Sequence, residues 1–185
     1  MILLIFGVGI WSAAHLFKRL APGPRGAMGT AGKGVVAVGI LTGLVLMIWG
    51  YRVADLVPVY LPLPGMGHAN NLLMLAAIYL YGVGGAKGRV SHMLRHPMLL
   101  GTIVWSVAHL LVNGDLASII LFGGIAIWAF VQMLAINLRE GGWMPAHRIK
   151  PRGDLVNVGV TLVVYAVVSA IHIWLGRNPF LGTYG

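Results

Sequence analysis

The chain contains no cysteine, and only four of its 185 residues are acidic. Without cysteine it forms no disulfide, no iron–sulfur cluster and no thiolate metal site. The acids Asp55, Asp115, Glu140 and Asp154 all fall at or beyond the ends of the predicted helices, so they offer no carboxylate cluster for a hard cation or a proton relay. The chain also lacks GxSxG, P-loop and HExxH sequences, which argues against a hydrolase or a nucleotide-driven pump.

Charge of either sign is scarce. Only 9% of the residues are charged and 58% are hydrophobic, with a mean hydropathy of +0.87, whereas soluble domains carry about 25% charged residues. A soluble fold could not bury this much apolar surface, so we expect a lipid bilayer to be the solvent. The sequence therefore predicts an all-α, polytopic membrane helical bundle that forms a single domain over residues 1–185.

Eleven of the thirteen Lys and Arg residues fall in three short segments between apolar runs. These segments hold Lys18, Arg19, Arg25 and Lys33; Lys87, Arg89 and Arg95; and Arg139, Arg148, Lys150 and Arg152. Because cationic loops stay on the cytoplasmic side of a membrane, this distribution predicts that both termini lie outside the cytoplasm. The net charge of +9 then serves topology and contact with anionic lipid head groups, and we expect no nucleic-acid partner.

Six apolar runs are long enough to cross a bilayer, which takes about 20 residues. The expected helices cover residues 2–20, 35–54, 68–86, 97–112, 116–138 and 155–175. The first run has no cation before it, so we expect a retained helix rather than a signal peptide. Pro97 suits a first helical turn, and Asp115 and Asp154 are placed to cap the last two helices. Gly39 and Gly43 form a small-xxx-small pair, for which packing within the molecule is the preferred interpretation.

Polar residues recur at three- and four-residue spacing on three of these helices, and a fourth opens with a polar cluster. An unpaired polar group is costly in lipid, so these faces are expected to point into a common interior. The faces comprise Ser12, His15 and Arg19; His68, Asn70 and Asn71; Thr102, Trp105, Ser106, His109 and Asn113; and Asn157, Thr161, Tyr165, Ser169 and His172.

The seven histidines are the candidate functional residues. His15 and His109 lie deepest, and each is either a structural hydrogen-bonding residue or a ligand. Neutral imidazole binds iron, copper or zinc, and paired histidines on different helices hold haem inside helical bundles. The remaining histidines have a simpler interpretation as solvated side chains near a membrane surface: His68, His92, His96, His147 and His172.

Three segments together resemble the NnrU family: AHLFK at 14–18, RHPMLL at 95–100 and WSVAHLLVNGD at 105–115. The similarity extends through the hydrophobic layout of the first five helices, and residues 95–115 are its specific part. The resemblance implies a bacterial inner-membrane protein associated with nitrite and nitric oxide metabolism. The family also includes 15-cis-zeta-carotene isomerase, a haem b enzyme with histidine ligation.

This resemblance carries His15 and His109 over as axial ligands of haem b. Supporting cofactor contacts are expected from His96, His172, Trp105 and Asn113. Helix geometry leaves the pairing open, because a rise of 1.5 Å per residue separates the depths of His15 and His109 by about 10 Å. On depth alone, His109 pairs with His172 or His68, and His15 pairs with His96.

Three functions therefore remain open. The preferred one is a haem-binding protein of denitrification, and the first alternative is a haem-dependent cis–trans isomerase that acts on a hydrophobic small molecule such as a carotenoid. The second alternative is a non-enzymatic assembly or transport factor whose histidines are structural. Arg95-His96-Pro97 also resembles isoprenylcysteine methyltransferase-like enzymes, but the aromatic and acidic residues that those enzymes add are missing, which argues against methyl transfer.

Overall fold

The computed structural model of the chain describes residues 1–181. All regular secondary structure in this range is helical, and one isolated antiparallel bridge joins Pro58 to Asp115. The elements are α1 (Ile2–Leu20), α2 (Pro22–Ala27), α3 (Ala31–Arg52), α4 (Met66–Ala86), η1 (Val90–His92), α5 (Pro97–Val112), α6 (Leu116–Ser118), η2 (Ile119–Gly123), α7 (Gly124–Glu140) and α8 (Gly153–Trp174). The all-helical prediction is confirmed, and the bounds of α1 and α5 agree with the sequence.

Two local features differ from the sequence prediction. The proline- and glycine-rich connection after α1 is partly helical, because Pro22 occupies the first turn of α2, where its missing N–H needs no partner. The helix after Asp115 contains a π-helical segment, η2, between α6 and α7. Asp115 caps this helix as predicted, since its carboxylate accepts a hydrogen bond from the Ser118 N–H at 2.9 Å. Asp154 does not cap α8; it lies inside the first turn and bonds elsewhere.

Five helical segments in the described part of the chain are long and apolar enough to cross a membrane: 2–20, 31–52, 66–86, 116–140 and 153–174. The sixth predicted span, α5, has 16 residues and a length of about 24 Å. Many large apolar side chains lie exposed on these helices, for example Val38 and Leu41 on α3 and Val163 on α8. Exposure on this scale fits a polytopic membrane protein whose outer surface meets lipid. The count of six spans and the external N-terminus stay predictions.

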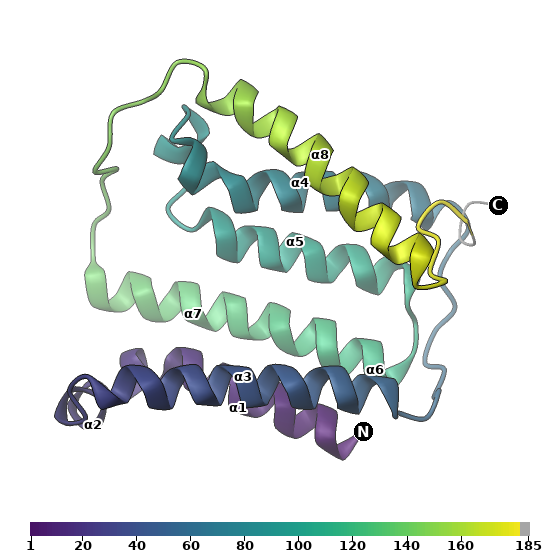
Figure 1. The fold of residues 1–185 in the computed structure, drawn as a ribbon, viewed down its shortest axis with the longest axis horizontal. Coiled ribbons are helices and arrows are strands. Elements are labelled where there is room, and N and C mark those ends of the chain that lie inside the picture. Colours follow the sequence, from purple (N-terminus) through teal and green to yellow (C-terminus); the bar gives the residue numbers. More distant parts are fainter. Residues whose placement is uncertain (182–185) are drawn as a thin grey trace. The chain divides into compact units, whose positions relative to one another are not determined.

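The chain divides into two compact units. Unit 1 consists of Met1–Tyr60 and Gly114–Gly141, and unit 2 consists of Leu61–Asn113 together with the segment from Gly142 onward. In unit 1, α1 packs against α3 on one side and against α7 and η2 on another; Figure 1 shows α1 running behind α3. In unit 2, α4 is the central helix and packs against both α5 and α8.

The contact between α1 and α3 depends on glycine. A Cβ built on Gly43 would lie 2.7 Å from the backbone N of Trp11, and one built on Gly7 would lie 2.6 Å from the backbone N of Met47. A Cβ built on Gly50, two turns after Gly43, would lie at least as close to the backbone N of Leu4. Such close backbone approach is the usual function of small residues between membrane helices. The Gly43 contact therefore lies within the molecule, as the sequence favoured.

We predict that Gly43→Ala and Gly50→Ala each lower the thermal unfolding midpoint of the detergent-purified protein. The added methyl group would collide with backbone rather than with a flexible side chain, and such overpacking costs about 1–3 kcal/mol. Gly34→Ala in the same helix is the control, because a Cβ at Gly34 has no neighbour within 4 Å. Equal midpoints for Gly43→Ala and Gly34→Ala would show that the close contact is not needed.

Candidate functional site

His15 in unit 1 lies between two tryptophans. Its ring centroid is 4.3 Å from that of Trp11, one turn earlier on α1, and 4.8 Å from that of Trp128 on α7. The two indoles are 5.9 Å apart and nearly perpendicular. We call Trp11, His15 and Trp128 the aromatic cluster. Contacts on two sides restrict rotation of the imidazole.

The hydrogen bond of His15 defines its tautomer. Nδ1 lies 3.0 Å from the carbonyl oxygen of Trp11, and because a carbonyl only accepts, Nδ1 carries the proton. In a neutral imidazole the lone pair then resides on Nε2, which no group among residues 1–181 engages. This is the form in which a histidine binds a metal through Nε2.

Unit 2 contains both His109 on α5 and His172 on α8. Their imidazoles are close enough to interact electrostatically, and the ring centroid of Trp105 lies 5.2 Å from that of His109. The side-chain amide of Asn113 donates to the His109 carbonyl oxygen at 2.8 Å. Four of the six residues predicted as cofactor contacts therefore form one group at one end of α5 and α8: Trp105, His109, Asn113 and His172.

His172 repeats the arrangement of His15. Its Nδ1 donates to the carbonyl oxygen of Val168, one turn earlier on α8, at 2.8 Å. Nε2 again holds the lone pair. Two of the histidines that face the interior of their own units are thus held in the same tautomer by their own helices.

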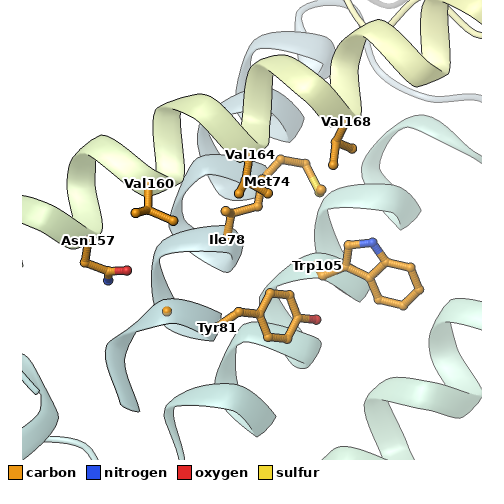
Figure 2. Close-up of a pocket in the computed structure, with 9 residues that line it drawn as sticks. Met74, Ile78, Tyr81, Trp105, Asn157, Val160, Val164 and Val168 are labelled. Carbon is orange, nitrogen blue, oxygen red and sulfur yellow. The ribbon is translucent and has the colours of Figure 1, made fainter. Parts of the chain in front are cut away.

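A groove of about 430 Å³ crosses unit 2 between α5 and α8, with α4 as its floor. Figure 2 shows Val160, Val164 and Val168 in a row along α8, with Trp105 on the opposite wall. Its lining is apolar apart from Asn157, Tyr81 and the indole of Trp105. Trp105 belongs both to this groove and to the group around His109, so the two features are continuous.

His96 lies apart from this group. It precedes Pro97 at the start of α5, thirteen residues from His109, which is about 20 Å along the helix. Within unit 2 the structure therefore does not bring His96 to the other predicted cofactor contacts. Its place before the proline gives it a role at the helix start, where its carbonyl oxygen accepts the Leu100 N–H at 2.9 Å.

A second histidine pair, at the opposite end of unit 2, holds the connection before α8 in place. The His92 Nε2 donates to the carbonyl oxygen of His147 at 2.8 Å, and the His147 Nε2 lies 2.8 Å from the Ser91 hydroxyl. Asp154 accepts hydrogen bonds from the backbone N–H groups of Arg89 and Val90. The Asp154 carboxylate thus fastens α8 to the 88–92 segment instead of capping its own helix.

Six buried side-chain atoms within residues 1–181 have no hydrogen-bond partner: Trp11 Nε1, Trp128 Nε1 and Gln132 Oε1 in unit 1, and Asn70 Oδ1, Ser106 Oγ and Thr161 Oγ1 in unit 2. Each such group in a native protein calls for an explanation, and a bound molecule is one. Sequence reasoning placed the unit 2 residues on polar faces but missed Trp128 and Gln132, although Gln132 is a polar residue within an apolar run and follows Trp128 by four positions. Trp11 could have been found from its spacing of four residues before His15.

His15 and His172 each offer an Nε2 lone pair on an imidazole whose Nδ1–H is anchored, which is a donor suited to haem iron. Among residues 1–181, no group of three or more His, Cys, Asp or Glu side chains is placed to hold a metal ion. A haem iron already has four porphyrin nitrogens and needs only one or two axial ligands, for which a neutral histidine with an anchored Nδ1–H is suited. His15, His109 and His172 are the candidates.

The fold and these inward-facing histidines define a polytopic helical membrane protein. Residues 3–179 match the model of the family described as NnrU protein. Since the match covers nearly the whole sequence, the chain belongs to the NnrU family, as its motifs indicated. Searches of curated proteins and of solved structures found no match to the chain.

We predict that the second histidine pair makes the protein less stable in acid. Burial, and then the neighbouring His92 and Lys87, lower the pKa of His147 from its usual 6.5. The folded state therefore favours neutral His147. The stability that depends on neutral His147 is fully present above pH 6.5, and it declines as the pH falls from 6.5 toward the lowered pKa. Between pH 7.5 and 5.5 the wild-type unfolding midpoint should fall more than that of His147→Asn. Identical pH dependence in wild type and His147→Asn would contradict this.

Proposed function

We propose that this NnrU-family chain is a multi-pass protein of the bacterial inner membrane that binds haem b through histidine and acts in nitrite and nitric oxide metabolism. The observation that supports it most directly is the fixed tautomer of His15 and His172. Each imidazole gives its Nδ1–H to a carbonyl oxygen of its own helix and presents the Nε2 lone pair. The link to nitrogen oxides comes from family membership.

The surroundings of these histidines suit an apolar macrocycle. The imidazole of His15 lies between Trp11, whose ring is tilted to it, and Trp128, which contacts it edge-to-face. The imidazole of His109 contacts Trp105 edge-to-face. Aromatic rings give planar, apolar surfaces at which a porphyrin can be buried. Bound haem would supply a redox-active iron that His15, His109 or His172 would hold.

Two ligand sets follow. Resemblance to the family favours His15 with His109, and the electrostatic interaction between His109 and His172 within unit 2 supports His109 with His172 as the second set. His109 belongs to both sets. Variants at the three positions therefore distinguish the sets.

We predict that the protein, purified in detergent after expression with adequate haem, shows a Soret absorption band. His109→Ala should abolish or shift this band, because an axial ligand is lost. A matching loss in His15→Ala supports the first ligand set, and a loss in His172→Ala supports the second. His92→Ala is the control, because this histidine lies at the opposite end of unit 2 and donates to the His147 carbonyl oxygen.

Protein without bound iron under these conditions would contradict haem binding. The result would favour the non-enzymatic alternative, an assembly or transport factor in which the hydrogen bonds of His15 and His172 serve packing alone.

The groove in unit 2 favours a second candidate function, a haem-dependent cis–trans isomerase of a hydrophobic molecule. Its walls are mainly valine, methionine, isoleucine and aromatic side chains, which suit an extended apolar substrate. Trp105 lines the groove and also contacts His109, so a molecule in the groove would lie next to a candidate haem ligand.

If the protein is an isomerase, we predict that it converts 15-cis-zeta-carotene under reducing conditions. Val164→Trp should then reduce the rate of conversion while leaving the Soret band intact. The larger side chain would fill the middle of the groove without touching a histidine that we propose as ligand. Val163→Trp is the control, since Val163 is 64% exposed and lies outside the groove. Haem-loaded protein that leaves this substrate unchanged would support the role in nitrogen-oxide metabolism instead.

A further inference from the structure

The aromatic cluster of unit 1 contains two buried hydrogen-bond donors without acceptors. The indole N–H groups of Trp11 and Trp128 are both buried and have no partner within residues 1–181. Tryptophan has one polar atom, and this atom only donates. Burial of such a donor in an apolar environment is costly unless an acceptor is present.

The two donors flank the one histidine of unit 1. Both indoles contact the His15 ring, whose Nε2 lone pair is also left unused by the protein. Gln132 follows Trp128 by one turn of α7 and adds a buried, unpaired acceptor oxygen on the same helix face. Three of the six unpaired buried atoms thus belong to α1 and α7, close to His15 or one turn from its stacking partner.

This coincidence has a simple chemical explanation. A molecule bound at the Nε2 of His15 and carrying acceptor oxygens would satisfy the lone pair and the indole N–H groups together. The carboxylate-bearing haem of the proposed function has this chemistry. An imidazole held only by its hydrogen bond to Trp11 could still tilt, whereas ring contacts from both α1 and α7 restrict its plane.

We infer that Trp11 and Trp128 are positioning residues for haem at His15: their rings orient the imidazole, and their N–H groups donate to acceptor atoms of the bound group. This inference rests on the first proposed ligand set, in which His15 binds haem, and a Soret band unchanged in His15→Ala would overturn it. It assigns two functions to each tryptophan, and these can be separated. Substitution by phenylalanine keeps an aromatic ring and removes the N–H, whereas substitution by leucine removes the ring as well.

The first experiment measures ring positioning without haem. Nuclear magnetic resonance of histidine labelled with ¹⁵N in the full-length apoprotein, in lipid nanodiscs, reports the tautomer and the motion of His15, with His15→Asn assigning the signal. Wild type, Trp11→Phe and Trp128→Phe should show one Nδ1–H form. Trp128→Leu should show a broadened signal, because the imidazole has lost its support from α7.

The second experiment measures the N–H donors in the haem-loaded protein. Trp11→Phe and Trp128→Phe should each raise the dissociation constant for haem about tenfold, the equivalent of one buried hydrogen bond. Each should also lower the midpoint potential of the haem, because an N–H dipole near the iron stabilises the reduced state. Trp49→Phe is the matched control in unit 1, since Trp49 is 62% exposed on α3.

The outcomes separate this inference from the proposed function. Haem that binds at His15 with an affinity and potential unchanged in both phenylalanine variants would overturn the inference and leave the proposed function standing. An unchanged His15 signal in Trp128→Leu would overturn the orienting role. Apoprotein that takes up no haem would overturn both proposals, and the resonance measurement would then still show whether the tryptophans order the imidazole.

Discussion

Within lipid, an imidazole must place its single N–H on an acceptor, and the nearest acceptor is a carbonyl of the same helix. His15 and His172 both use the carbonyl oxygen of the residue four positions earlier, Trp11 and Val168. That bond determines which nitrogen keeps the lone pair, and the chemistry of each histidine follows from it. Because this bond leaves the lone pair on Nε2, the aromatic contacts of His15 and the electrostatic interaction of His172 with His109 act on an imidazole whose ligating nitrogen is Nε2.

The polar groups at the ends of the helices obey the same constraint. Tyr51 lies 2.9 Å from the Ser118 hydroxyl, which donates to the Asp115 carboxylate at 2.6 Å, so a chain of hydrogen bonds closes one end of unit 1. Arg19 and Glu140 form an ion pair between α1 and α7. In unit 2, Asp154 performs a similar function for α8. Asp115, Glu140 and Asp154 thus connect segments from positions at or near helix ends.

Local signals predicted the helices well, and long-range contacts were beyond them. The apolar run at 2–20 and the proline at 97 gave the bounds of α1 and α5, because both depend only on neighbouring residues. Of the candidate site, the spacing of Trp105, His109 and Asn113 predicted a shared face, and their local contacts agree. Spacing alone could not show that Trp128 contacts His15, because α7 is more than one hundred residues away in sequence. It also misplaced Asp154, since an acid near a helix start resembles a cap whether its partner is its own helix or a distant turn.

The π-helical segment Ile119–Gly123 alters the relation between sequence and surface along α7. One extra residue in a turn rotates everything downstream by about 100° relative to a regular α-helix. The face that carries Trp128 and Gln132 is therefore not the one that α-helical counting from Asp115 would select. An alignment of related chains that shifts by a single position between 119 and 123 would assign the wrong partner to His15. A natural deletion in this segment would turn the Trp128 indole away from His15 even though every aromatic residue was retained.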